Sequence, residues 1–408
     1  MRASVLASIP DTASQANASA KPWENVTAQE RQELAETLAL LNLGEHDYWT
    51  LLDKADACVV AHHGTAVRFE RSIFFSWYCS IRDCAFCYMS TQPKDKTRMA
   101  RRTFESLYVE TFLSRVLGWQ FGFLSGGTGV YTPAEIKGLI KNVSGILGKR
   151  IWLNIGVISE TLLKDISPFI EGVTGSVETV DRELHPKVCP SKPLEPIEKM
   201  YGHAAALGLQ NAMTFIIGLG EKPSVIRELE EFISKHHIVK IHLYGLNPQA
   251  GTAYESTTPP SKYLQAWYIA NIRLAFPDLD IEAGVWEDRI SYIPLLLHAG
   301  ATSLSKFPAT RLFGKKQSFD FEDAVRSAGR EFLGTLTKMP APGFDWVAQI
   351  AKLDADEDVK ELIRKKLFDY VDVMAGTKKL VRRSGKGQSR TRKVVAVQKT
   401  VQEQGKNI

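Results

Sequence analysis

Short apolar runs alternate with longer amphipathic segments along most of the chain. Eight runs have the β-branched and aromatic composition of strands: 71–78, 121–126, 151–156, 172–178, 211–220, 239–246, 280–285 and 301–307. Between them, apolar residues recur at helical spacing in segments that include 104–117, 133–147, 197–207 and 224–236. Strands that alternate with helices predict an α/β protein with a parallel sheet. Eight such units favour a (β/α)8 TIM-type barrel, and an open doubly wound sheet is the alternative.

The segments that flank the eight strands predict helical extensions at both ends of the barrel. Helical patterning covers 28–43 and 47–57 before the first strand, and 322–336 and 357–374 after the last one. The first 25 residues are rich in Ala, Ser and Thr without a helical stripe, so we expect a disordered leader. The predicted organisation is a leader (1–25), a barrel with N-terminal helices (26–310), a helical extension (311–377) and a basic, disordered tail (378–408).

The net charge of +5 is unevenly distributed along the chain. The tail holds ten Lys or Arg against the single acid Glu403, a net charge of +9, which leaves −4 for the remainder. A tail of this composition buries too little apolar surface to offset the entropy of ordering, about 1–2 kcal/mol per residue. We therefore expect it to be dispensable for any chemistry. Its charge would attract a polyanion or an acidic partner protein.

The composition also predicts the compartment. No apolar run approaches the roughly 20 residues that a membrane span needs, and Pro10 and Asp11 interrupt the short apolar stretch at the N-terminus. We therefore predict neither a membrane segment nor a signal peptide. An odd number of cysteines, five, without export favours a reducing cytoplasm over a disulfide framework.

Three of the five cysteines fall within nine residues, in the pattern Cys-x4-Cys-x2-Cys: Cys79, Cys84 and Cys87. They follow the first predicted strand directly, which places them on the C-terminal rim of a barrel, where active-site loops gather. Structural zinc needs four ligands, and only His62, His63 or Cys189 could supply the fourth. A [4Fe–4S] cluster held by three cysteines instead leaves one iron open to a ligand. The spacing favours such a cluster, and a zinc-stabilised nucleic-acid-binding protein is the competing hypothesis.

The cysteine loop resembles that of radical S-adenosylmethionine enzymes. Their usual spacing is Cys-x3-Cys-x2-Cys with an aromatic residue, here Phe86, before the last cysteine; in this chain the first gap is one residue longer. The segment "LSGGTG" (124–129) resembles the Gly-Gly-Glu-type turn of the family, with Thr in place of Glu. The resemblance implies that Gly126, Gly127 and Thr128 hold the methionine amino group. We expect a valine at Gly127 to block the cofactor and leave the cluster intact.

Further segments resemble the biotin synthase-like group of that superfamily. This group includes the [FeFe]-hydrogenase maturase, methylornithine synthase and the iron-guanylylpyridinol cofactor maturase. The matching segments extend the likeness over about residues 45–310: "GSVETVDRELHP" (175–186), "MTFIIGLGE" (213–221), "NPQAGTAYE" (247–255) and "LLLHAGATSLS" (295–305).

The resemblance assigns residues in these segments to the cofactor. It implies that Glu178 binds the ribose or the amino-acid end of S-adenosylmethionine, and that Gly218 and Leu219 line the adenine. Relatives often contact the cofactor carboxylate with an Arg early in the helix after the fourth strand. This chain has no Arg there, and Arg182 and Lys199 are the candidates to replace it.

The implied activity is the reductive cleavage of S-adenosylmethionine at a [4Fe–4S] cluster, which gives a 5′-deoxyadenosyl radical that abstracts hydrogen from a small-molecule substrate. An electron donor such as ferredoxin or flavodoxin would be required. A role in cofactor biosynthesis or maturation fits better than sulfur insertion by this chain alone, because only Cys58 and Cys189 remain for a second cluster. One subunit of a two-protein lipoyl or biotin synthase-like system is the alternative. Polar residues at strand ends are the candidates to contact substrate: Asn154, His242, Tyr244, Asn247, Glu282 and Lys306.

Overall fold

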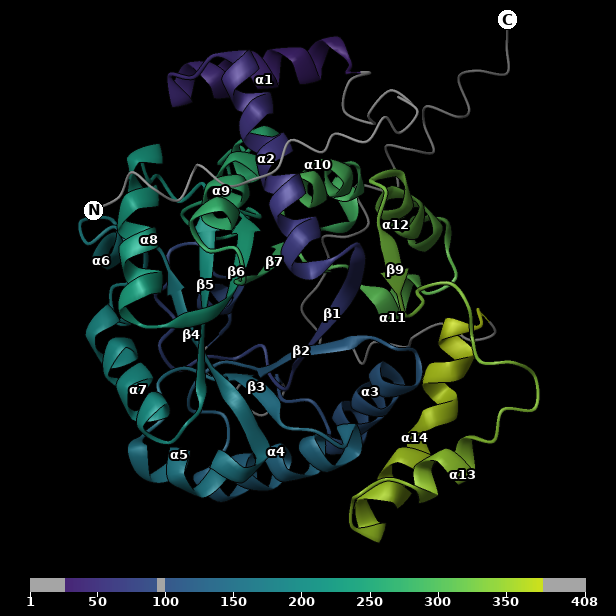
Figure 1. Ribbon diagram of the computed structural model, residues 1–408. Helices are drawn as coiled ribbons and strands as arrows, with labels where there is room; N and C mark the ends of the chain where they lie inside the picture. The colour runs from purple at the N-terminus through teal and green to yellow at the C-terminus, as the bar shows by residue number, and fades with distance from the viewer. Residues whose placement is uncertain (1–25, 94–99, 377–408) are drawn as a thin grey trace, which may run out of the picture.

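A computed structural model of the chain describes residues 26–93 and 100–376 (Figure 1). The predicted disordered leader falls outside these residues, as does the basic tail, so both remain predictions. No helix among the described residues is both long enough and apolar enough to cross a membrane.

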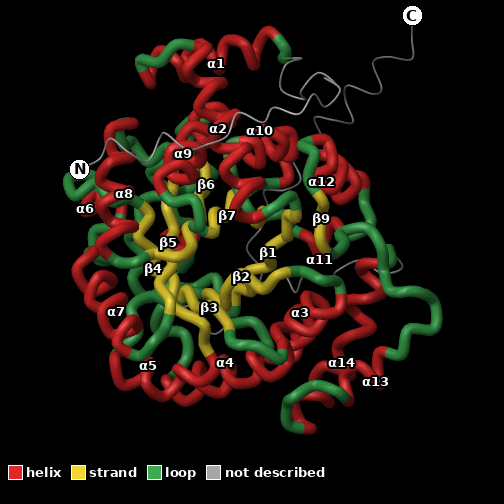
Figure 2. Tube along the Cα trace, viewed as in Figure 1, coloured by secondary structure: helices red, strands yellow, loops and turns green. Residues whose placement is uncertain are grey.

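Eight parallel strands close into a barrel at the centre of the molecule (Figure 2). Strand β1 (Ala66–Phe74) pairs with β2 (Gln120–Ser125) on one side and with β8 (Ser303–Ser305) on the other, which closes the ring. The others follow in chain order: β3 (Ile151–Asn154), β4 (Ile170–Glu178), β5 (Gln210–Ile217), β6 (Ile238–Gly245) and β7 (Asp280–Gly284). The predicted (β/α)8 barrel is confirmed, and the doubly wound alternative is wrong.

Helices surround the strands as an outer layer (Figures 1 and 2). These are α3 (Phe104–Val116), α4 (Pro133–Leu147), α5 (Glu160–Ile166), α7 (Leu194–Ala206), α8 (Ile226–Lys235), α9 (Lys262–Ala275) and α10 (Ile293–His298). Shorter turns lie in the connections: α6 (His185–Val188), η1 (Tyr88–Thr91), η3 (Ser167–Phe169), η4 (Pro223–Val225) and η5 (Glu287–Tyr292). Before the barrel, α1 (Ala28–Leu41) and α2 (Glu45–His63) form the N-terminal extension, and α2 packs on α9.

The bounds of α4 coincide with the predicted ones because the sequence marks both ends. Thr132 accepts from the N–H of Glu135, and the Glu135 carboxylate accepts from the N–H of Thr132 in return. Pro133 occupies the first turn, where a missing N–H costs nothing. Gly148 ends the helix in a left-handed conformation at φ 68°.

The C-terminal extension differs from the prediction in its first half. The helix predicted over 322–336 is α12 (Lys316–Ser327), which ends before Gly329 at φ 70°. The chain then forms a ninth strand, β9 (Glu331–Leu333), which pairs in parallel with the start of β1. The remaining helices are α11 (Ala309–Leu312), α13 (Trp346–Ala351) and α14 (Glu357–Met374); α14 has the predicted bounds and packs on α3.

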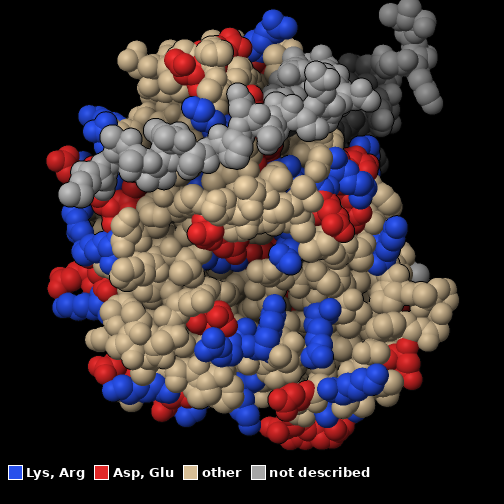
Figure 3. All heavy atoms as spheres, in the orientation of Figure 1, with Lys and Arg blue, Asp and Glu red and all other residues tan. Residues whose placement is uncertain are grey.

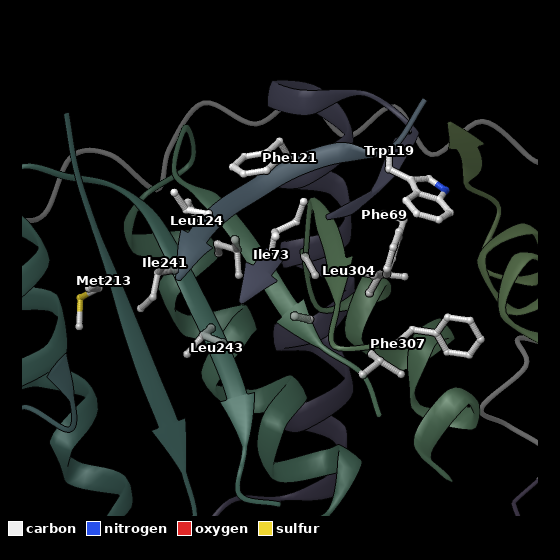
Figure 4. Close-up of a cluster of buried hydrophobic side chains, with 14 of the residues drawn as sticks. Phe69, Ile73, Trp119, Phe121, Leu124, Met213, Ile241, Leu243, Leu304 and Phe307 are labelled. Atoms are coloured by element: carbon white, nitrogen blue, oxygen red, sulfur yellow. The ribbon is translucent and has the colours of Figure 1, made fainter. Parts of the chain in front are cut away.

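Aromatic packing anchors β1, the strand that leads to the cysteines (Figure 4). The Phe69 ring meets Trp119 edge-on, with centroids 5.7 Å apart, and meets Phe321 of α12 at 6.0 Å. All three side chains are buried, and such edge-to-face pairs stabilise a core beyond the apolar area that they bury. The extension after the barrel therefore helps to fix the strand that positions the site.

Candidate functional site

The cysteine loop follows β1, although β1 ends earlier than predicted. The strand stops at Phe74 rather than Tyr78, because Ser76 pairs with Arg101 in an antiparallel bridge outside the barrel. The loop then carries three free, partly exposed thiols: Cys79, Cys84 and Cys87. The structure therefore places the three cysteines together on the C-terminal rim of the barrel.

Contacts with the turn after β2 fix the first part of the loop. Ser80 donates its backbone N–H to Thr128 O at 3.0 Å, and the two side-chain hydroxyls lie 2.9 Å apart. Thr128 Oγ1 also lies 3.5 Å from Cys79 Sγ. Thr128, which the resemblance assigns to the cofactor, thus also supports the first cysteine.

The two glycines of this turn make room for the cysteine loop itself. A Cβ on Gly127 would lie 1.8 Å from Tyr78 O and 2.5 Å from the Cα of Cys79. A Cβ on Gly126 would lie 2.2 Å from the ring of Phe75. The structure therefore changes what we expect of a valine at Gly127: the added side chain would displace the loop that carries the cysteines, so the cluster should be affected as well as the cofactor.

A second set of contacts holds the Cys84 end of the loop. Ala85 donates its N–H to Val188 O at 2.8 Å and accepts from Ala253 N–H at 3.0 Å. Cys84 and Phe86 pack against a small apolar cluster that joins the end of β5, the end of β6 and the segment after α6: Val188, Cys189, Ile216, Leu219, Tyr244 and Leu246. Two strand ends, the segment around α6 and the cysteine loop thus form one unit.

Cys189 lies beside Cys84, although the two are 105 positions apart in the sequence. Of the residues considered as a fourth ligand, Cys189 is therefore the one that lies at the cysteine loop. The Cys189 thiol donates a hydrogen bond to Cys84 and lowers the pKa of Cys84, and Lys192 acts in the same direction. Burial raises the pKa of Cys87 to about 11. The rim thus gathers a fourth sulfur near the loop.

The other zinc-ligand candidates lie elsewhere. His62 and His63 end α2, before the start of β1 and so at the opposite end of the barrel from the cysteine loop. His62 Nδ1 pairs with Asp278 at 2.8 Å, and His63 Nε2 lies 3.0 Å from Pro277 O. Cys58, also on α2, contacts the backbone of Arg273. The prediction that the two histidines could complete a zinc site is wrong.

The three thiols do not form a ready tetrahedral metal site among the described residues. At Zn–S distances of about 2.3 Å, tetrahedral ligands lie roughly 4 Å apart. Among the described residues, only Glu70, His242 and Glu282 bring three such ligand atoms within 4.8 Å of one another, and no cysteine takes part.

Glu178 is held at the end of β4 by two polar partners. Its carboxylate accepts from Lys192 Nζ at 2.8 Å and from Thr214 Oγ1 at 2.9 Å. Its backbone has φ 63°, the left-handed conformation that non-glycine residues adopt mainly where the surroundings enforce it. The lysine side chain is 13% exposed and the glutamate 12%. This ion pair presents both charges at the rim, next to Cys84.

Lys192 is a positively charged residue of the site that the sequence did not predict. Arg182 and Lys199, the residues that we expected to contact the carboxylate, are 68% and 69% exposed and pair with Glu198 and Glu195 on the outer surface. Burial disfavours the charged form of Lys192, but Glu178, Cys189 and Cys84 together outweigh it and raise the pKa of Lys192. A search for a cation in the loop before the helix, rather than in the helix, could have found this residue.

The segment expected to line the adenine uses part of its backbone internally. Gly218, at φ 99°, donates its N–H to Glu221 Oε1 at 2.7 Å. Leu219 O accepts from Tyr254 Oη at 2.7 Å, and the Leu219 side chain is buried in the apolar cluster beside Phe86. The Gly218 N–H and the Leu219 carbonyl thus already have partners within the protein. What the two residues offer to a ligand is an apolar surface.

The polar candidates at the strand ends separate into three groups. Asn154 Oδ1 accepts from Ser176 Oγ at 2.6 Å, on the β3–β4 side of the barrel. Asn247 Oδ1 accepts from Arg289 at 3.2 Å, above β6. The last group lies in the barrel interior on the β6–β8 side: His242, Tyr244, Glu282 and Lys306.

His242 and Glu282 form a buried pair below the rim. His242 Nδ1 contacts Glu282 Oε2, and Tyr244 Oη donates to Glu282 Oε1 at 3.3 Å. Burial lowers the pKa of His242, whereas His242 and Lys240 outweigh the effect of burial and lower the pKa of Glu282. At neutral pH the pair therefore consists of a neutral imidazole that donates to a carboxylate. Both residues are fully buried, and the pair supports Tyr244 from below because Glu282 accepts the tyrosine hydrogen bond.

A second buried group lies deeper in the interior. Lys240 contacts the carboxylates of Glu70 and Asp280, the latter at 3.0 Å, and Ser303 Oγ donates to Glu70 at 2.8 Å. Burial raises the pKa of Glu70 to about 8. This network joins β1, β6, β7 and β8 across the interior, so it closes the end of the barrel away from the cysteines.

Comparison with known proteins identifies relatives of the chain. No family model matches it. It is 40% identical over 289 residues to "Uncharacterized protein MJ0597" of Methanocaldococcus jannaschii, a match that covers 70% of this chain and 79% of that protein. The chain belongs to the same family as this protein.

Two solved structures share the barrel. Methylornithine synthase (PylB) superposes with a TM-score of 0.62 at 20% identity, over 78% of this chain and 96% of its own. The FeFe-hydrogenase maturase HydG from Carboxydothermus hydrogenoformans gives 0.59 at 12% identity, over 86% and 92%. At such identities the similarity concerns the fold. Both proteins belong to groups that the sequence resembles. The resemblance is therefore confirmed at the level of the fold.

Proposed function

We propose that the protein is a radical S-adenosylmethionine enzyme that cleaves this cofactor reductively at a [4Fe–4S] cluster and uses the resulting 5′-deoxyadenosyl radical to abstract hydrogen. The observation that carries the proposal is the fit between the cysteine loop and the turn after β2. A Cβ at Gly127 would overlap Tyr78 O and the Cα of Cys79, so a glycine is needed for the turn to approach the cysteine loop this closely. The three thiols are thereby placed at the mouth of a closed barrel.

In this proposal each group of rim residues has a separate role. Cys79, Cys84 and Cys87 hold the cluster, which supplies the electron that cleaves the sulfonium. The Gly126–Thr128 turn positions the methionine amino group. Lys192, rather than Arg182 or Lys199, places a positive charge near the cofactor carboxylate, with Glu178 holding its side chain in place.

The barrel would protect the radical from solvent. Phe86 and Leu219 supply an apolar wall beside the cysteine loop, and the Glu70–Lys240 network closes the far end of the interior. A site that excludes water also excludes competing hydrogen donors. A closed barrel therefore suits this chemistry.

We further propose cofactor biosynthesis or maturation as the biological role. Sulfur insertion would need a second cluster. The other two cysteines share no site, because Cys58 lies on α2 and Cys189 lies beside Cys84. Ferredoxin or flavodoxin would supply the electron, and the free thiols suit a reducing cytoplasm. Basic and acidic side chains are interspersed over the face shown in Figure 3, which gives no support to a nucleic-acid surface there.

Anaerobic reconstitution with iron and sulfide tests the function directly. We expect a brown protein with broad absorbance near ~400 nm and about four irons per chain. After addition of a reductant and S-adenosylmethionine, 5′-deoxyadenosine and methionine should form in equal amounts, as measured by chromatography. A colourless protein that holds one zinc ion would contradict the proposal.

Replacement of Lys192 tests the assignment of the cofactor carboxylate. Lys192→Gln keeps a hydrogen-bond donor for Glu178 but removes the charge, so we expect the Kd for S-adenosylmethionine to rise at least about tenfold. Iron content should not change. Lys199→Gln is the matched control, because this exposed lysine on α7 pairs with Glu195 and with no other acid among the described residues. Equal calorimetric affinities for the two variants would refute the role of Lys192.

A further inference from the structure

Lys306 directly follows the end of β8 and has an unusual backbone conformation. Its backbone has φ 66°, a left-handed conformation that is uncommon for a residue with a side chain and that clusters at functional sites. A Cβ on Gly284, the last residue of β7, would lie 3.1 Å from Lys306 Cγ and 2.4 Å from Tyr244 Cδ1. The glycine therefore allows the lysine stem and the tyrosine ring to pack over the end of β7.

The ammonium group of Lys306 lies among aromatic rings. Its Nζ is 3.9 Å from the centroid of Tyr244, 5.8 Å from that of Trp286 and 5.9 Å from that of Phe74. Cation–π contacts of this kind favour the charged form. Among the described residues, no carboxylate lies within 4 Å of this nitrogen and no hydrogen bond reaches it. Desolvation lowers the pKa of Lys306, with Glu282 and Glu178 acting against it from a distance.

A second donor beside this cage also lacks a partner. Trp286 Nε1 is buried, and no acceptor reaches it among the described residues. Buried donors of this kind are usually satisfied, because leaving one unpaired costs about 1–3 kcal/mol. Trp286 contributes its ring to the lysine cage, so the two unpaired donors lie near each other.

We propose that Lys306 and Trp286 bind the carboxylate of the substrate. One cation and one neutral N–H match a group with a single negative charge and two oxygens, whereas a phosphate dianion would bring more charge than one lysine offsets. The position fits a substrate because Phe74, the third wall of the cage, is the last residue of β1 and leads into the cysteine loop. The identification of the bound carboxylate as that of the substrate rests on the proposed function.

Titration of the cluster-loaded protein, saturated with S-adenosylmethionine and labelled with 15N-tryptophan, tests the site. The probe is acetate, acetamide is its neutral counterpart, and Trp286→Phe identifies the indole N–H resonance of Trp286. We expect a saturable shift of that resonance with acetate, none with acetamide and a weaker response to phosphate. Lys306→Met should weaken acetate binding at least about tenfold, and Lys306→Arg should retain it.

The controls separate this site from the cofactor and from folding. Lys164→Met, on the exposed face of α5, should bind acetate within twofold of the parent protein. Calorimetry should give the same affinity for S-adenosylmethionine in Lys306→Met; a tenfold loss would mean that the carboxylate is the cofactor's and would overturn the assignment. Equal shifts with acetamide, or acetate binding that survives Lys306→Met, would overturn it as well. Failure to hold iron would instead contradict the proposed function, and acetate titration of the iron-free protein would then still test the site, because Lys306 and Trp286 lie outside the cysteine loop.

Discussion

Cys84→Ala should abolish both iron binding and cleavage of S-adenosylmethionine. A cluster held by three thiolates loses one of its iron ligands in this variant, and no other described residue of the cysteine loop offers a thiolate in its place. We expect iron to fall from about four per chain to a small fraction, and 5′-deoxyadenosine to fall below detection. Cys79→Ala and Cys87→Ala should behave alike. Iron analysis and product chromatography after anaerobic reconstitution provide the measurement.

The remaining cysteines supply controls of two kinds. Cys58→Ala changes a thiol on α2, at the other end of the barrel, and should leave iron content and cleavage unchanged. Cys189→Ala is the stricter control, because Cys189 contacts Cys84. We expect the cluster to persist without it. Full activity of Cys84→Ala would contradict the assignment of the three thiols, and loss of iron in Cys189→Ala would make that residue a ligand.

The barrel could be predicted because its signals are local. The strands β2 to β8 lie within a few residues of the predicted runs, and capping residues such as Thr132 and Gly148 mark the ends of α4. β1 was placed too late because the apolar run continues through Trp77 and Tyr78, whose backbone leaves the barrel for the segment near residue 100. β9 was missed because three residues carry too little periodicity to compete with a helical pattern.

The site could be predicted in part, because only some of its residues share a motif. The three cysteines are adjacent in sequence and could be found from spacing alone. Cys189 and Lys192 come from the loop before α7, and only the folded chain brings them beside Cys84. Trp286 was not selected either, since a single aromatic after a strand is no different from a core residue in sequence. Non-local contacts of this kind leave no periodic pattern.

Gly127→Val should remove the cluster as well as weaken cofactor binding. The first carbon of the new side chain would overlap Tyr78 O and the Cα of Cys79, and backbone atoms cannot yield as the end of a flexible side chain can. Overpacking of this kind costs about 1–3 kcal/mol or more, and here the strain falls on the loop that holds the thiols. We expect a lower midpoint of thermal unfolding and less than half of the iron of the parent protein.

Gly138→Ala is the matched control for this loss. Gly138 lies on the exposed face of α4, and a Cβ there would meet no atom within 4 Å. Alanine is favoured over glycine in a helix by up to about 1 kcal/mol, so this variant should unfold at the same or a higher temperature with full iron. If Gly127→Val kept its iron and lost only affinity for S-adenosylmethionine, the glycine would serve the ligand rather than the loop. The close contact between the two rim segments would then have to open when the cofactor binds.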